Sequence, residues 1–223
     1  MAVEIELKAR LEDDFEPIRE RLFTMGEYCR AYLKSDTYWL PAQPAAGQLV
    51  ARQPAAPIPS GVRVRRESGV NAGGDAFGSV LVTYKTKEVT DGIEVNDECE
   101  FTVSDALVFE ELLGRLGLCK THHKEKKGWA WLIEAPRQPP QAAAQRQPPP
   151  ILAELSLVEG LGWFLEIEIQ VENGSGQAVI DQSRRRLLAL LEQLEIPADQ
   201  IESRPYTLML KVTEEERSGK ERL

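Results

Sequence analysis

Cysteine, histidine and long apolar runs are scarce in this chain of 223 residues. The three cysteines are odd in number and form no CxxC pair, and there are only two histidines, which argues against a disulfide framework and a zinc site. No stretch approaches the roughly 18 apolar residues of a membrane span, and the charged opening MAVEIELKAR lacks the apolar centre of a secretory signal. The chain has 36 acidic and 27 basic residues, and this net charge of −9 disfavours nucleic-acid binding. We therefore expect a cytoplasmic protein that binds neither membranes nor nucleic acids.

Two proline-rich stretches interrupt the chain. Residues 41–60 and 136–150 concentrate Pro, Ala and Gln, and each Pro removes a backbone donor and fixes φ. Neither stretch is therefore expected to form regular structure within a core. We interpret both as exposed loop insertions in a single domain that spans residues 1–223.

Apolar and polar residues alternate over much of the remaining chain, which is the pattern of a half-buried β-strand. Three other segments, at 13–25, 104–116 and 177–194, place apolar residues at helical spacing, and Ser104 is expected to cap the second helix. Short connections between successive strands favour an antiparallel sheet. The expected strands lie at 3–8, 61–65, 80–87, 98–103, 164–169 and, less regularly, 124–131.

The polar faces of these strands carry like charges. Residues i and i+2 of a strand point to the same side, so Glu4, Glu6 and Lys8 share one face. Like charges two residues apart repel each other, so solubility alone does not explain their recurrence. A closed sheet that turned these faces inward would enclose a polar interior with acidic and basic zones. The further acidic pairs are Glu166/Glu168 and Glu98/Glu100, and the basic pairs are Arg63/Arg65, Lys85/Lys87 and Lys124/Lys126.

This charge layout suits a metal-bound triphosphate. Clustered carboxylates without His or Cys partners are hard oxygen donors, which favour Mg²⁺ or Mn²⁺. Arg and Lys complement a polyphosphate, Arg as a bidentate fork and Lys as a point charge. The alternative is a half-exposed sheet whose charged face meets water, in an interaction protein without a tunnel.

The same residues resemble the CYTH superfamily of triphosphate tunnel metalloenzymes. Glu4, Glu6 and Lys8 match its opening ExExK signature, and residues 161–168 (LGWFLEIE) are similar to its LGxFxEIE segment. Asn96 and Lys126 depart from the pattern, because arginine is usual at both places. The other similar segments, in the family's order, are 35–38 (SDTY), 62–65 (VRVR), 82–85 (VTYK), 96–100 (NDECE), 124–129 (KEKKGW) and 203–210 (SRPYTLML).

The resemblance implies a mainly β fold (α+β), an eight-stranded antiparallel β-barrel or tunnel with outer helices, and a metal-dependent enzyme. It assigns Glu4, Glu6, Glu166 and Glu168 to the divalent metal, and these four with Lys8 to catalysis. The residues implied to bind the triphosphate are Lys8, Arg63, Arg65, Lys85, Lys124 and Lys126, and the further tunnel residues are Glu98, Glu100 and Lys87.

Within the superfamily the chain most resembles the CyaB-type class IV adenylate cyclases. That branch implies conversion of ATP to cyclic AMP and pyrophosphate, and a homodimer. Hydrolysis of inorganic tripolyphosphate or of thiamine triphosphate uses the same charge layout and stays an alternative. A further alternative is non-catalytic binding of polyphosphate or nucleotide, which the four glutamates disfavour because a pure anion binder has no use for carboxylates beside phosphates.

Overall fold

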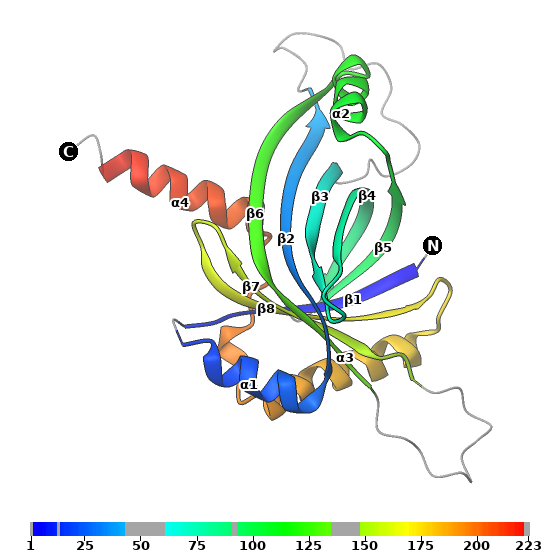
Figure 1. The fold of residues 1–223 in the computed structure, drawn as a ribbon, viewed down its shortest axis with the longest axis vertical. Helices are drawn as coiled ribbons and strands as arrows, with labels where there is room; N and C mark the ends of the chain where they lie inside the picture. Colours follow the sequence, from blue (N-terminus) through cyan, green and yellow to red (C-terminus); the bar gives the residue numbers. More distant parts are fainter. Residues whose placement is uncertain (1, 13, 43–60, 91–92, 135–147, 221–223) are drawn as a thin grey trace.

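The computed structural model describes residues 2–12, 14–42, 61–90, 93–134 and 148–220 (Figure 1). Eight strands close into an antiparallel barrel in the order β1-β5-β4-β3-β2-β6-β7-β8, and β1 closes the ring by pairing with both β5 and β8. The expected mainly β barrel with outer helices is confirmed. The strands are β1 (Ala2–Arg10), β2 (Glu27–Pro41), β3 (Val62–Asn71), β4 (Ala76–Thr90), β5 (Ile93–Thr102), β6 (Leu118–Ile133), β7 (Ile151–Val158) and β8 (Gly162–Glu172). The helices are α1 (Glu16–Met25), α2 (Ala106–Arg115), α3 (Gln177–Gln193) and α4 (Tyr206–Lys220), with a short 3₁₀ turn, η2 (Ala198–Gln200), before α4.

The observed elements extend and correct the expected ones. All six expected strands are present, but β2, β7 and α4 lie outside the expected set. The cap of α2 is Asp105 and not Ser104, because the Asp105 side chain accepts hydrogen bonds from the Leu107 and Val108 amides at 2.8 and 3.1 Å. The two expected insertions fall largely on residues 43–60 and 135–147, outside the described residues.

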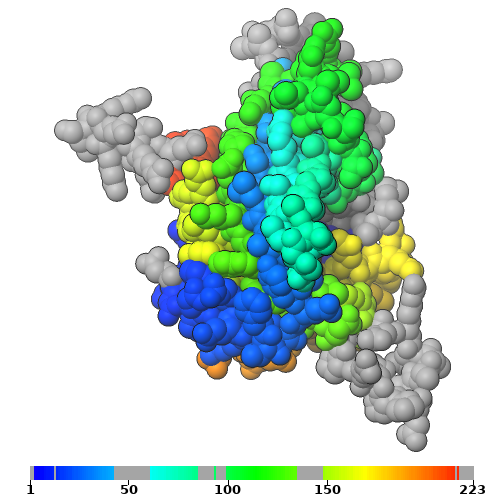
Figure 2. Space-filling view, viewed as in Figure 1, coloured from blue at the N-terminus to red at the C-terminus, as the bar shows by residue number. Residues whose placement is uncertain are grey.

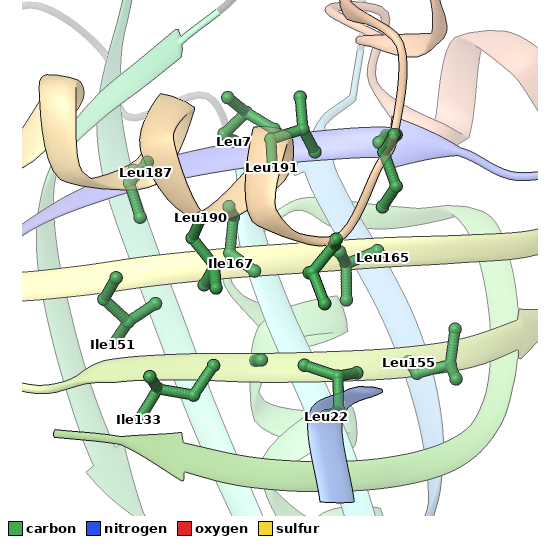
Figure 3. Close-up of a cluster of buried hydrophobic side chains, with 14 of the residues drawn as sticks. Leu7, Leu22, Ile133, Ile151, Leu155, Leu165, Ile167, Leu187, Leu190 and Leu191 are labelled. Carbon is green, nitrogen blue, oxygen red and sulfur yellow. The ribbon is translucent and has the colours of Figure 1, made fainter. Parts of the chain in front are cut away.

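The main apolar core lies outside the barrel wall, where α1 and α3 cover β1, β6, β7 and β8 (Figure 3). Leu187, Leu190 and Leu191 of α3 recur at helical spacing and are buried against this wall. Burying one such side chain contributes roughly 1.5–3 kcal/mol, so this packing fixes which face of each strand points outward. On β1 the outward face is Ile5 and Leu7.

Two smaller apolar clusters lie elsewhere on the barrel. Ala106 and Leu113 anchor α2 on Val64 of β3, which places α2 at the end of the molecule opposite α1 (Figure 2). The other cluster joins the first turn of α4 to the facing ends of β7 and β8. Among the described helices, none is long and apolar enough to cross a membrane.

Because the outward positions are apolar, the alternate positions of the strands face the barrel interior. On β1 these are Glu4, Glu6 and Lys8, and the register places Glu6 opposite Glu168 and Lys8 opposite Glu166. The packing of apolar side chains outside the barrel thus positions the charged residues inside it.

Candidate functional site

All eight strands contribute to a cavity of about 460 Å³ inside the barrel. Its lining is charged apart from Leu81, Leu152 and Gln170. Eight of the residues singled out in the sequence are brought together here: Glu4, Glu6, Arg63, Arg65, Glu100, Lys126, Glu166 and Glu168. Four charged lining residues were not singled out: Arg30, Lys34, Glu67 and Glu154.

Four of the seven acidic lining residues, Glu4, Glu6, Glu166 and Glu168, come from the neighbouring strands β1 and β8. Burial, the adjacent Glu4 carboxylate and, more weakly, Glu154 and Glu6 raise the pKa of Glu168 well above its usual range. Two carboxylates held close together in a poorly solvated place cannot easily both ionise. The crowding disfavours the charged form of Glu168, and a cation bound between these groups would relieve it.

Asp36 of β2 organises part of the basic lining. Its carboxylate accepts a bidentate pair of hydrogen bonds from Arg65, at 2.7 and 2.9 Å, and lies 3.0 Å from Nζ of Lys124. Burial alone would raise the pKa of Asp36, but the charges of Arg65 and Lys124 outweigh it and hold the pKa well below its usual range. The bidentate contact fixes the plane of the Arg65 guanidinium at the cavity wall.

Glu154 of β7 holds a second group of cations. It pairs with Lys34 and, at 3.1 Å, with Lys126, and Arg30 reaches it at 3.3 Å. Burial alone would raise the pKa of Glu154, but the charges of Lys34 and Lys126 outweigh it and hold the pKa well below its usual range. Burial lowers the pKa of Lys34 to about 8, even though the Glu154 charge opposes that shift.

Lys126 joins this group to the acidic strands, because its ammonium also pairs with Glu166. The Lys126 charge, followed by that of Lys124, overcomes the effect of burial and lowers the pKa of Glu166 to about 2. Glu166 is therefore paired internally in its charged form, whereas the surroundings of Glu168 disfavour its charged form.

Arg63 and Glu100 meet through a threonine. The Thr83 hydroxyl accepts a hydrogen bond from Arg63 at 3.0 Å and donates one to Glu100 at 2.9 Å. Arg63 and Glu100 themselves approach to 3.9 Å. The interaction links β3, β4 and β5 across the inner face.

The remaining sequence candidates lie in other places. Lys8 and Lys124 point into the barrel but are buried beside the start of α4 and do not line the cavity. Lys85 of β4 pairs in register with Glu98 of β5, and Lys87 follows on the same strand. The side chains of Lys85, Lys87 and Glu98 are outside the described part of the chain.

Three of the missed lining residues, Arg30, Lys34 and Glu154, left weak signals in the sequence, and so did Asp36. Arg30, Lys34 and Asp36 occupy alternate positions of β2 in the segment RAYLKSD. Glu154 is the one charged residue of the strand ILAELSLV. An isolated charge in an apolar strand can be read as inward-facing, but neither signal names its partner.

No protein-family profile matches the chain, and no curated protein matches its sequence. Solved structures do match. The PH1819 protein from Pyrococcus horikoshii OT3 superposes with a TM-score of 0.65 at 22% identity, over 93% of this chain and 98% of that one. The chain shares its fold. A candidate adenylate cyclase from Vibrio parahaemolyticus gives a TM-score of 0.63 at 16% identity, over 93% and 97% of the two chains. HpAC1 from Hippeastrum, described as a candidate adenylyl cyclase with a dominant triphosphatase activity, gives 0.55 at 13% identity, over 95% and 96%.

Proposed function

We propose that this chain is a CYTH-type, metal-dependent enzyme that acts on a triphosphate inside its barrel. The observation that carries the proposal is the cavity, where carboxylates of β1 and β8 share one enclosed space with the cations of β2, β3 and β6. The fold shared with the candidate cyclase and with HpAC1 supports it, as do the ExExK and LGxFxEIE resemblances in the sequence.

The donor set fits a hard divalent cation. Glu4, Glu6, Glu166 and Glu168 offer only carboxylate oxygens, the ligands that suit Mg²⁺ and Mn²⁺, and the raised pKa of Glu168 reports their crowding. Among the described residues, no three acidic, His or Cys side chains are already grouped around one metal position, so the glutamates would have to rotate to hold the metal. When bound, such a metal would polarise phosphate oxygens and activate the attacking group.

The cations would bind and orient the phosphates. Arg65 offers a guanidinium that Asp36 already holds in plane, and Arg63 and Lys126 also line the cavity. Lys34 and Arg30 extend this set to positions that the sequence motifs do not mark. Charges fixed before the substrate arrives stabilise developing phosphate charge at little reorganisation cost.

The lining bears on which reaction takes place. A nucleoside base needs an apolar or stacking surface, and among the described lining residues Leu81 and Leu152 are the sole apolar ones, with no aromatic ring. This favours hydrolysis of an unconjugated triphosphate such as tripolyphosphate. The cyclase reaction, which the CyaB-type resemblance favours, is the second candidate.

One pair of reactions tests the proposal: purified protein with Mg²⁺ or Mn²⁺ and either tripolyphosphate or ATP, with products separated by chromatography. Orthophosphate from tripolyphosphate would support the hydrolase, and cyclic AMP with pyrophosphate would support the cyclase. Glu6→Gln should abolish the metal-dependent reaction, whereas Glu20→Gln, the same change at an exposed position of α1, should retain it. If neither substrate reacts and neither raises the melting temperature with metal present, the proposal is wrong.

From the same resemblance we also propose that the protein forms a homodimer. Sedimentation equilibrium at micromolar concentration would test it, and a monomer mass would contradict it.

A further inference from the structure

The first turn of α4 closes against the barrel at the place where two predicted phosphate-binding lysines lie. α4 begins beside β6 and β7 and then projects away from the barrel (Figure 1). Its residues Tyr206 and Met209 are buried, whereas Leu208 and Val212 are exposed. The helix is therefore tied to the barrel through its beginning.

The ammonium groups of both lysines contact the ring of Tyr206. Nζ of Lys8 is 4.5 Å from the ring centroid, and Nζ of Lys124 is 4.6 Å from it. Phe164 packs edge-on against the same ring at 5.0 Å between centroids. An aromatic face attracts cations, and most strongly where water is excluded.

Backbone contacts hold the segment before Tyr206 against β1. The Glu202 amide donates to the Lys8 carbonyl at 2.8 Å, and Ile201 forms a bridge with Ala9. Nζ of Lys8 in turn donates to the carbonyl of Arg204 at 2.7 Å. The position of the Tyr206 ring relative to β1 is thus set by the backbone contacts of Lys8 and Ala9 together with the hydrogen bond from the Lys8 side chain.

We propose that Tyr206 is a positioning residue for the triphosphate site, whose ring holds the ammonium groups of Lys8 and Lys124 at the wall of the barrel. A lysine has a flexible four-carbon stem, and without the ring the Lys8 ammonium could turn toward Glu166, its register partner on β8. Lys124, which already lies 3.0 Å from Asp36, would lose the ring as its second restraint. The C-terminal segment thereby completes a site built by strands from the rest of the chain. This inference rests on the proposed function for its effect on triphosphate, but the ring contacts themselves do not.

The test compares Tyr206→Phe, which keeps the ring, with Tyr206→Leu, which removes it and keeps a buried apolar side chain. Met209→Leu, in the same helical turn and cluster, is the matched control. Binding of tripolyphosphate with Mg²⁺ is measured by calorimetry, and folding by melting temperature. We expect roughly tenfold weaker binding for Tyr206→Leu, and a change within about twofold for Tyr206→Phe and for the control.

A second readout examines the ring contacts without substrate. In protein labelled with ¹³C-lysine, the ε-methylene signals of Lys8 and Lys124, assigned through Lys8→Arg and Lys124→Arg, should carry a ring-current shift. That shift should persist in Tyr206→Phe and vanish in Tyr206→Leu. If the leucine variant does not fold, Tyr206→Met takes its place in both measurements.

The outcomes separate the two ideas. If Tyr206→Leu binds tripolyphosphate as tightly as the wild type, Tyr206 has no positioning role. If Tyr206→Phe loses as much affinity as Tyr206→Leu, the effect belongs to the hydroxyl, which would also overturn the proposal. Unshifted lysine signals in the wild type would also overturn it. Wild-type protein that binds no tripolyphosphate would overturn the proposed function, while the lysine signals would still decide whether the ring holds the ammonium groups.

Discussion

Replacing Asp36 with asparagine should be among the most damaging single changes in the barrel. The carboxylate is fully buried and holds both Arg65 and Lys124. Asparagine has nearly the same shape, so it leaves no cavity, but it removes the one negative charge that these contacts share. The buried Lys124 and the mostly buried Arg65 would then lose their counter-ion.

The expected cost follows from that burial. Breaking a buried ion pair by removing one partner destabilises a protein by roughly 3–5 kcal/mol, against a total stability of about 5–15 kcal/mol. The change also has a pH signature. Because the folded pKa of Asp36 is depressed, the carboxylate stabilises the folded state above its unfolded pKa of about 3.9. That stabilisation is lost as the pH falls through the folded pKa, so the wild-type advantage should be full near neutral pH and shrink below about pH 4.

Urea unfolding of wild type and Asp36→Asn at several pH values measures this difference directly. Glu111→Gln is the control, because Glu111 pairs with Arg115 on the exposed surface of α2 and such a pair contributes about 0–1 kcal/mol. A loss of less than about 1 kcal/mol in Asp36→Asn would refute the reasoning. A difference that did not depend on pH would refute the electrostatic part of it.

Three further predictions concern the acidic face, the titrating lysine and the strand packing. Glu168→Gln should stabilise the metal-free protein at neutral pH, because the raised folded pKa of Glu168 makes the wild type lose stability as the pH rises above about 4.3. The same variant should also abolish the rise in melting temperature that we expect Mg²⁺ to cause. An unchanged rise would contradict the metal assignment. The pKa of Lys34 is lowered to about 8, whereas an arginine at this position stays charged. The affinity for tripolyphosphate should therefore fall more steeply above about pH 8 in wild type than in Lys34→Arg. Parallel curves of affinity against pH would exclude a role for Lys34 deprotonation. Gly128→Ala should destabilise the protein by about 1–3 kcal/mol or more, because its Cβ would lie 2.1 Å from the Leu155 carbonyl oxygen. Gly114→Ala, in open space on α2, should instead stabilise it by about 0.4–1 kcal/mol, and equal unfolding midpoints for the two variants would refute the packing argument.

Strand alternation predicts most of this barrel because six of its strands contrast an apolar outer face with a charged inner face. That contrast is missing in β7, where the inward Leu152 and Ser156 carry no charge and the outward positions are buried under helices. It is blurred in β2, whose outer face includes the exposed Leu33 while the inner face includes Tyr32. Both strands are therefore revealed by pairing with their neighbours and not by their own sequence pattern.

The first turn of α4 shows another limit. Leu208 and Val212 remain exposed, so the helix has no continuous apolar face that periodicity could detect. Tyr206, one of its two buried anchors, packs on Lys8 and Lys124, which lie more than 80 positions away along the chain.

For the site, alternation predicts which side chains face inward but not which of them meet. The pairs Glu4/Glu6 and Glu166/Glu168 come to one wall because β1 and β8 are neighbours, which the motifs alone do not state. Asp36 contacts Arg65 and Lys124 because β2 lies between β3 and β6 in register. The contacts of counter-ions such as Asp36 and Glu154 depend on this strand order, so their roles cannot be read from the sequence pattern alone.

The internal ion pairs bear on how the proposed site would bind its ligands. Lys126 and Lys34 already pair with the carboxylates of Glu154 and Glu166. A polyphosphate that bound these lysines without a metal would leave the buried carboxylates unpaired and close to its own negative charge, which is costly. A divalent cation on Glu166 and Glu168 would neutralise the carboxylates as the phosphates took the lysines. The same pairs lower the cost of a charged interior, since each buried cation that has an internal counter-ion is less expensive to bury. By linkage, metal and triphosphate would then raise each other's affinity by the same factor, and the protein would select the metal–triphosphate complex over either component alone.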